Sequence, residues 1–214
     1  MPERPGLSAA QARRKRAFDL VVGGTALVAT SPLIVVGVAA ATVSTRQWGI
    51  FSQERVGRNG ETFRVHKVRS MRRLDGVTTT VTAGTDPRIT RVGGWLRRLK
   101  IDELPQLVNV VLGEMSIVGP RPDVAGWADL LEGPDRVVLS VRPGITGPAS
   151  VAFRHEEDML DAADDPEVYN REVIWPEKVR LNRRYVESWS LREDVRWIVA
   201  TVTSVLSRGD SGRR

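Results

Sequence analysis

The sequence predicts an α+β fold: one domain with short strands among helices, preceded by a kinked membrane helix and followed by an amphipathic C-terminal helix. Three observations support this fold class. Residues 20–45 contain no charged side chain. This uncharged segment is long enough for a membrane helix. In the middle of the chain, short apolar segments bounded by Gly, Asn and Pro alternate with segments of helical periodicity. Near the end, apolar residues at positions 191, 195, 198, 202 and 205 follow helical spacing.

The uncharged segment is interrupted by Pro32, which follows Ser31. A straight helix over residues 20–45 would be about 39 Å long at 1.5 Å per residue. Proline removes a backbone donor and clashes with the preceding turn, so we expect a kink at Ser31 and Pro32, with the Ser31 hydroxyl available to a carbonyl that the kink frees. The segment is therefore predicted to be two apolar arms.

Basic residues flank this segment on both sides, at positions 13–16 and then at Arg46, Arg55 and Arg58. Lys and Arg remain on the cytoplasmic side of a bacterial membrane, so both flanks favour the same side. A re-entrant helix satisfies both, although an ordinary single-pass anchor fits the length equally well. A cleaved signal peptide is disfavoured because the apolar run is too long, and a core helix of a soluble protein is the remaining alternative.

Composition suggests four regions: a basic tail over 1–16, the membrane helix over 17–46, one domain over 47–207 and a short tail over 208–214. The chain has no cysteine, which excludes disulfides and thiolate metal sites, and we expect the domain to face the cytoplasm. The net charge is +12 over residues 1–100 and −6 over 101–214. A basic half beside an apolar segment suits anionic lipid and phosphate ligands. Nucleic-acid binding is disfavoured because few aromatic residues lie among the basic ones.

The first half of the domain begins with a hairpin pattern. Strands are predicted over 50–52 and 62–68, separated by a turn with Gly57, Asn59 and Gly60. Residues 74–86 are rich in Thr, Gly and Asp, which is typical of a mobile loop. A short basic helix is predicted over 90–99, and a second helix from Asp102, as N-cap, to Gly113.

The second half continues with a strand at 116–118 that leads into Pro-Arg-Pro, and a helix is predicted over 124–131. Residues 141–151 suggest turns around an extended segment. The acidic segment 155–165 is interpreted as a solvated helix with a loop, without chemistry. Helices follow over 176–189 and from 191 onward; the last one lies either on the membrane surface or on the domain core.

Asp102 and Glu103 are adjacent acids that follow a basic run. Taken alone, a helix cap is the simpler explanation. The functional alternative is that the helix dipole and the nearby cations keep Asp102 ionised, as a carboxylate nucleophile or metal ligand must be.

Several cations are candidate phosphate ligands. Arg121 lies between Pro120 and Pro122, so its backbone has little freedom and its guanidinium would make a bidentate clamp; an exposed arginine in a rigid turn is the alternative. Lys67 and Arg69 lie on one face of a predicted strand, and Arg88 follows a Thr-Asp-Pro turn. A solvated basic face would have the same pattern. A membrane segment, basic residues and a carboxylate pair together favour transfer of a phosphoryl-linked group to a lipid.

These motifs resemble those of the bacterial sugar transferases that act as monotopic polyprenol-phosphate phosphoglycosyl transferases. The similarity runs from about residue 15 to 206. The segments that carry it are KRAFDLVV with the following Ser-Pro, QERVGRNGETF, HKVRSM, TDPRITRVGGWLRR, IDELPQLVNVVLGEMSIVGPRP and RPGITG. Their order and spacing together are specific.

The resemblance implies a re-entrant helix and a cytoplasmic catalytic domain at the bacterial inner membrane. It implies a Mg²⁺-dependent reaction in which a UDP-sugar donates its sugar phosphate to undecaprenyl phosphate with release of UMP, the first membrane step of polysaccharide or glycoconjugate synthesis. Asp102 would be the nucleophile of a covalent phosphosugar intermediate and would contact Mg²⁺, with Glu103 as its partner. Lys67, Arg88 and Arg121 would bind phosphate, and Pro120 and Pro122 would frame Arg121.

The chain departs from the family pattern at two places. Pro148, Ala149 and Ser150 stand where a bulky residue, Ala and Gln are usual, and Asn182 stands where Asp is common. Either change would affect donor choice or packing. The sequence leaves open the sugar, the pathway and homo-oligomer formation. The alternative from another functional class is a membrane-anchored basic scaffold or regulator; an inactive enzyme of the same fold is disfavoured by the intact acid pair.

Overall fold

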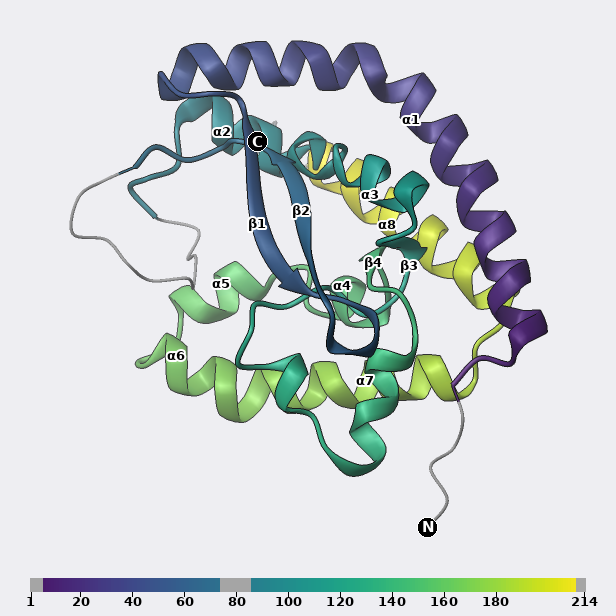
Figure 1. Ribbon diagram of the computed structural model, residues 1–214. Coiled ribbons are helices and arrows are strands. Elements are labelled where there is room, and N and C mark those ends of the chain that lie inside the picture. Colours follow the sequence, from purple (N-terminus) through teal and green to yellow (C-terminus); the bar gives the residue numbers. More distant parts are fainter. Residues whose placement is uncertain (1–5, 74–85, 211–214) are drawn as a thin grey trace.

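The computed structural model describes residues 6–73 and 86–210, with side chains up to residue 205. Of the loop predicted over 74–86, only Asp86 lies within these residues. The model confirms an α+β mixture of helices and short strands (Figure 1). The elements in chain order are α1 (Ala9–Thr45), β1 (Ile50–Val56), η1 (Arg58–Gly60), β2 (Thr62–Val68), α2 (Arg91–Arg98), η2 (Ile101–Glu103), α3 (Gln106–Leu112), β3 (Ser116–Val118), η3 (Ala128–Leu130), η4 (Gly133–Ser140), β4 (Gly144–Thr146), α4 (Pro148–Ala152), α5 (Glu156–Asp161), α6 (Pro166–Tyr169), η5 (Asn170–Ile174), α7 (Trp175–Glu187) and α8 (Leu191–Asp210).

Helix α1 begins at Ala9, earlier than the membrane helix predicted from residue 17. Ser8 and Gln11 form a capping box at its start, in which each side chain bonds the other residue's backbone N–H. The basic residues 13–16 are therefore helical and do not form an extended tail. The helix ends at Thr45, where Arg46 has a left-handed backbone with φ of 56°.

The predicted interruption of α1 has a specific hydrogen-bond consequence. Pro32 lies inside the helix and cannot donate to the carbonyl of Val28, four residues earlier. The Ser31 hydroxyl donates to that carbonyl oxygen at 2.8 Å, which confirms the predicted compensation. Figure 1 shows α1 bent between two arms, one of which crosses the top of the view. Re-entry of α1 into a bilayer stays a prediction, because the shape of the helix does not by itself define its position in a membrane.

Among the described residues, α1 is the only helix long and apolar enough to cross a membrane by length and composition. Its most apolar window has a mean hydropathy of 2.1, and only 11% of that window is buried. Val21, Val28 and Val43 are 69%, 75% and 80% exposed. Because a soluble core helix buries most of its apolar side chains, this exposure disfavours that alternative.

The strands form two separate pairs. β1 and β2 are antiparallel, with Ile50 opposite Val68 and Val56 opposite Thr62. Asn59 and Gly60 have φ of 60° and 84° at the turn, as the sequence predicts. β1 runs to Val56, beyond the predicted end at residue 52, because polar residues such as Gln53 and Glu54 can lie on an exposed strand without an apolar alternation. β3 and β4 are parallel, with Ser116 paired to Gly144.

The second half of the chain differs from the prediction at two segments. The helix predicted over 124–131 is reduced to the 3₁₀ turn η3, which follows Gly126 with φ of 94°. Residues predicted as turns after Gly147 instead form α4, in which Pro148 occupies the first turn, where no backbone donor is needed.

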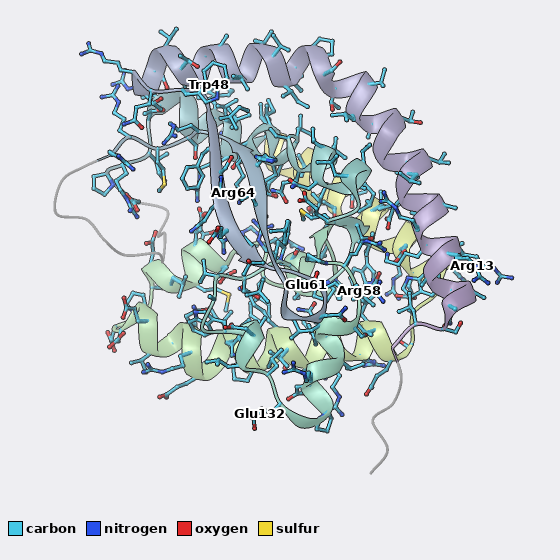
Figure 2. The ribbon with its side chains drawn as sticks, viewed as in Figure 1. Arg13, Trp48, Arg58, Glu61, Arg64 and Glu132 are labelled. Atoms are coloured by element: carbon cyan, nitrogen blue, oxygen red, sulfur yellow. The ribbon has the colours of Figure 1, made fainter. Side chains whose placement is uncertain are left out.

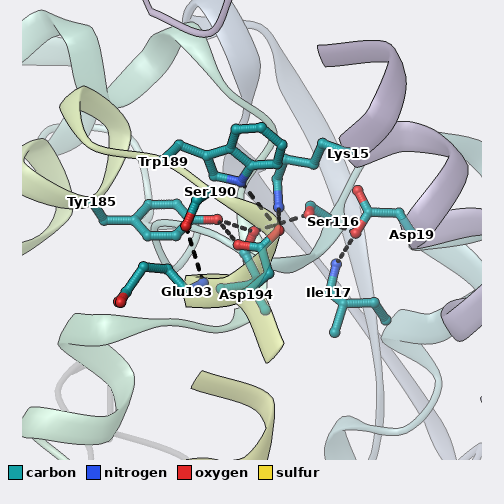
Figure 3. A network of polar contacts seen from close by, with 10 residues as sticks. Lys15, Asp19, Ser116, Ile117, Tyr185, Trp189, Ser190, Glu193 and Asp194 are labelled. Atoms are coloured by element: carbon teal, nitrogen blue, oxygen red, sulfur yellow. Dashed lines mark hydrogen bonds and ion pairs between the residues drawn. The ribbon is translucent and has the colours of Figure 1, made fainter. Parts of the chain in front are cut away.

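A buried polar network fastens α1 to the domain (Figure 3). Lys15 Nζ lies 2.8 Å from Asp194 Oδ2, and Asp194 also accepts hydrogen bonds from the Tyr185 hydroxyl at 2.6 Å and the Trp189 indole at 3.1 Å. Four residues after Lys15, Asp19 accepts from Ser116 Oγ and Ile117 N. The first arm of α1 is thus joined to α7, α8 and β3.

Helix α8 presents two different faces. Trp197 and Ile198 pack against the main core, whereas Val195, Val199 and Val202 are about half exposed. The core-packing alternative is therefore correct for one face, and the membrane alternative remains a prediction for the other.

Candidate active site

The acid pair lies in the short 3₁₀ turn η2 between α2 and α3. Lys100, just before the pair, has a left-handed backbone with φ of 57°, which reverses the chain after α2. Asp102 and Glu103 are only 7% and 8% exposed. The predicted N-cap role of Asp102 is wrong: α3 begins at Gln106 after Pro105, with no side-chain cap.

Glu103 is the centre of a cation cluster. Its Oε1 atom lies 2.5 Å from Arg121 Nη2 and 3.5 Å from Lys67 Nζ, and its Oε2 atom lies 4.0 Å from Lys100 Nζ. Burial raises the pKa of Glu103, but the charges of Arg121, Lys100 and Lys67 outweigh burial and hold that pKa well below its usual range. Glu103 is therefore ionised and orients three cations that come from different segments.

Asp102 differs from Glu103 in the pairing of its carboxylate and in the direction of its pKa shift. Its Oδ1 atom is buried, and no hydrogen-bond partner exists for it among the described residues. Burial and the charge of Glu103 raise the pKa of Asp102 to about 6, although Lys67, Lys100 and Arg97 act in the opposite direction. Asp102 is mostly ionised at neutral pH, with one oxygen free to attack an electrophile or to bind a cation.

Lys67 and Arg121 present their charges beside this carboxylate. Burial and the charge of Arg121 lower the pKa of Lys67 to about 8, against the opposing effect of Glu103. Arg121 is held between buried Pro120 and Pro122, and Glu103 raises its pKa. The Arg121 side chain is 37% exposed, so its remaining donors are available to a phosphate group.

Arg69 lies on the same strand face as Lys67, as predicted, because it contacts Phe51, the residue directly opposite Lys67, but within the described residues its contacts do not reach the acid pair. Its Nε atom donates to the Trp48 carbonyl at 2.8 Å, and its guanidinium lies 5.4 Å from the centre of the Phe51 ring. The Arg69 backbone N–H donates to the Gly49 carbonyl at 2.7 Å, which continues the hairpin pairing beyond Val68. Trp48, which is 70% exposed, is labelled in Figure 2 near the start of β1.

Arg88 is paired with Asp86 in the turn before α2. Its Nη2 atom lies 2.6 Å from Asp86 Oδ2, and its backbone N–H donates to Asp86 Oδ1 at 2.9 Å. The structure thus brings together Asp102, Glu103, Lys67 and Arg121, and holds Arg88 in an ion pair of its own. A phosphate role for Arg88 stays a prediction.

Residues that sequence reasoning missed adjoin the cluster. Gln106, 2% exposed and one helical turn after Asp102, has an unpartnered Nε2 atom. Asp123 follows the Pro-Arg-Pro segment, and burial raises its pKa to about 6 against the charges of Lys178, Arg55 and Arg121. In the sequence, the only indication that Gln106 and Asp123 belong to the site is that each lies next to a recognised motif. Hydrophobic periodicity does not show in which direction a loop side chain points.

The acidic segment 155–165 contains α5 and is mostly exposed, as predicted, but one of its residues also acts on the charges of the site. Glu156 lies 2.6 Å from Lys178 Nζ, and its charge contributes to raising the pKa of Arg121. The segment therefore belongs in part to the charge environment of the site.

A magnesium ion fits this donor set. Among the described residues, no group of three or more His, Cys, Asp or Glu side chains could hold a metal. Mg²⁺ usually takes one or two carboxylates, with substrate phosphates and waters completing its octahedron. The unpaired Oδ1 atom of Asp102 is such a carboxylate oxygen. Magnesium binding through Asp102 stays a prediction that the geometry allows.

The departures from the family pattern leave unpaired atoms. Ser150 Oγ in α4 and Asn182 Oδ1 in α7 are buried, and neither has a partner within the described part of the chain. Pro148 is accommodated at the start of α4. Position 182 borders a recess that Arg121 also lines.

Comparison with known proteins identifies similar chains. A family model described as "Bacterial sugar transferase" matches residues 10–208. The chain is 40% identical over 198 residues to an undecaprenyl-phosphate glucose phosphotransferase of Komagataeibacter xylinus, covering 88% of this chain and 35% of that protein. It is 34% identical over 212 residues to the exopolysaccharide production protein ExoY of Sinorhizobium fredii, and the match covers 91% of this chain and 87% of that protein. It is 36% identical over 195 residues to a UDP-glucose:undecaprenyl-phosphate glucose-1-phosphate transferase of Escherichia coli, and the match covers 88% of this chain and 39% of that protein. The matched region thus makes up little more than a third of two of these relatives and most of the other.

Proposed function

The chain belongs to the bacterial sugar transferase family, and from this premise we propose that it transfers a sugar 1-phosphate from a UDP-sugar to undecaprenyl phosphate. The products are undecaprenyl diphosphate sugar and UMP. Two relatives are named as glucose phosphate transferases that use undecaprenyl phosphate, and a third is named as an exopolysaccharide production protein. The proposed role is the first membrane step of such a synthesis.

One observation carries the proposal: the unpaired carboxylate oxygen of Asp102 lies next to a cation cluster organised by Glu103. A carboxylate can attack a phosphorus atom only if the negative charge of the diphosphate is screened. Arg121 and Lys67 are positioned to provide that screening. Glu103 fixes their side chains, so little reorganisation is needed when the donor binds.

The proposed reaction has two displacements at one phosphorus. In the first, an Asp102 oxygen attacks the phosphorus that carries the sugar, an Asp–O–P bond forms, and the bond to the UMP oxygen breaks with its electron pair leaving on UMP. In the second, a phosphate oxygen of undecaprenyl phosphate attacks the same phosphorus and the Asp102 carboxylate leaves. Mg²⁺, held by Asp102 and the diphosphate, would supply further charge neutralisation.

Membrane placement is part of the proposal. The exposed apolar surface of α1 and the basic residues on both flanks support a re-entrant helix at the bacterial inner membrane, with the domain on the cytoplasmic side. The phosphate of a polyprenol lies at the membrane surface, where a domain held on one face can reach it. Single cysteines at Ala10 and Glu61 should both react with a membrane-impermeant reagent only from the cytoplasmic side. Labelling from opposite sides would establish a spanning helix.

The activity is tested with undecaprenyl phosphate, Mg²⁺ and a panel of UDP-sugars, measuring UMP release. The Asp102→Asn variant should lose release, and Glu132→Gln, at an exposed site labelled in Figure 2, is the isosteric control. Intact mass of the wild type, quenched with donor alone, should show the added sugar phosphate. Absence of release with every donor, or undiminished release by Asp102→Asn, would contradict the proposal and favour the membrane-anchored scaffold.

A further inference from the structure

Arg121 borders a recess with about 360 Å³ of empty space, including open solvent. The recess lies between the end of β1, the segment that follows β3, η4 and α7. Arg121 also bonds Glu103, so the recess is directly adjacent to the cation cluster. Figure 1 shows α7 crossing the lower part of the molecule.

The walls of this recess are mainly apolar. Val56 and Leu139 line it, together with Trp175 from the start of α7. The Trp175 ring is fixed by an edge-to-face contact with Trp127, with ring centres 5.2 Å apart at an angle of 70°. A fixed aromatic side chain next to a phosphate site offers a rigid surface for a ring of the ligand.

Besides Arg121, two polar side chains interrupt the apolar lining, and both have unused acceptors. Asn182 is 6% exposed, and its Oδ1 atom has no partner in the described chain. The carboxylate of Asp123 has no hydrogen bond or ion pair within the described residues, although Lys178, Arg55 and Arg121 are near enough to act on its charge. A buried acceptor without a partner, as Asn182 Oδ1 is, is costly, so a ligand that donates hydrogen bonds fits this recess.

The chemistry of the acceptors discriminates between the two organic ends of a nucleotide sugar. Uridine presents one N–H donor on its base and two hydroxyls on its ribose, whereas a hexose carries more hydroxyl donors on a ring with apolar C–H faces. A carboxylate, an amide oxygen and an aromatic wall match the hexose better. Position agrees with this choice, because the phosphate that Asp102 would attack is the one joined to the sugar.

We infer that the recess binds the glycosyl group of the donor, with Asp123 and Asn182 accepting hydrogen bonds from its hydroxyls. This inference rests on the proposed function, since it assigns a subsite to the same donor. Asp123 and Asn182 would then determine which sugar is transferred, while Arg121 holds the adjoining phosphate.

The test compares Asp123→Leu and Asn182→Leu with the wild type and with Glu132→Gln. Both substitutions keep the number and branching of the side-chain heavy atoms and remove a polar group that has no partner, so thermal midpoints should not fall. With the preferred UDP-sugar, kcat/KM should decrease about 10-fold or more, mainly through KM. The preference over its epimers should shrink, while the inhibition constant of UMP stays within about twofold.

Binding titrations with UDP-sugar and UDP separate this inference from the proposed function. The wild type should bind the UDP-sugar more tightly than UDP, and each Leu variant should lose that difference. If UMP release fails but the sugar-dependent difference in binding is intact, only the proposed transfer is overturned. Unchanged sugar preference in both variants, a parallel rise in the UMP inhibition constant, or no sugar-dependent binding in the wild type would each overturn the inference.

Discussion

Two buried charge clusters of this chain differ in how completely their atoms are paired. In the fastening network of Figure 3, Asp194 accepts from Lys15, Tyr185 and Trp189. In the candidate active site, Glu103 is similarly paired, but the Oδ1 atom of its neighbour Asp102 has no partner among the described residues. A fully paired buried network stabilises one arrangement, whereas an unpaired buried oxygen keeps a binding capacity for something else. The difference separates a structural cluster from a chemical one.

The two clusters are also built on different parts of the fold. The fastening network joins side chains from α1, α7, α8 and β3, so packed elements fix them. The candidate site is built from a 3₁₀ turn, Lys67 near the end of β2 and a Pro-Arg-Pro segment. The turn and the Pro-Arg-Pro segment direct side chains without regular periodicity. Functional groups are often found on such connections, supported by rigid elements.

The strongest test of the comparison is Asp102→Asn. We expect UMP release to fall by about 10³-fold or more, because an amide is a very poor nucleophile. Since the folded-state pKa of Asp102 is raised to about 6, its ionisation destabilises the fold as pH rises from the unfolded-state pKa, near 4, to about 6. At pH 7.5 the variant should therefore be at least as stable as the wild type in thermal unfolding. A loss of stability together with activity would mean that Asp102 is structural.

Breaking the fastening network should give the opposite pattern. Lys15→Met leaves Asp194 buried without its cation, which typically costs about 3–5 kcal/mol. The double variant with Asp194→Leu should recover part of that loss. Unfolding by denaturant in detergent measures both, and equal stability of the single and double variants would contradict the pairing.

Arg121→Lys tests the geometry of the cation cluster separately from its charge. Lysine retains the positive charge but cannot hold Glu103 and a phosphate with a planar fork. We expect kcat/KM for the donor to fall by about 10- to 100-fold, with thermal stability little changed. An equal loss in Lys100→Arg, where charge and exposure are retained, would show that the effect is not specific to Arg121.

The pH dependence should follow the two groups whose pKa values lie nearest neutrality. Asp102 must be deprotonated to attack, so kcat/KM should rise with pH up to about 6. Lys67 must be protonated to bind phosphate, so kcat/KM should fall above about 8. Lys67→Arg should remove the alkaline limb and keep the acid limb. Persistence of the alkaline limb in that variant would assign it to another group.

The smallest effect is expected at Arg69, which shares a strand face with Lys67 but whose contacts are with Trp48 and Phe51. Arg69→Gln should change UMP release by less than about twofold, whereas Lys67→Gln should reduce it by 10-fold or more. Comparable losses in both variants would mean that Arg69 reaches the substrate after all.

Local sequence features predicted much of this protein. Pro32 and Ser31 indicated the hydrogen bond from the Ser31 hydroxyl to the carbonyl that Pro32 leaves unpaired, because that bond depends on neighbours in the chain, although α1 continues through Pro32 as one helix. The hairpin turn and the end of α3 at Gly113 followed from backbone preferences of single residues. The motifs around Asp102 and Arg121 were sufficient to identify the family.

Only the tertiary structure decided how these motifs meet. These residues are far apart in the sequence, and nothing in the sequence indicates that Arg121 and Lys67 both pair with the carboxylate of Glu103. The same is true of the buried ion pair between Lys15 and Asp194. It is also true of the recess that Asp123 and Asn182 both border. The physical reason is that helix caps, kinks and turns depend on residues within a few positions. Pairing of buried charges depends instead on desolvation and distance, which exist only once distant segments have packed together.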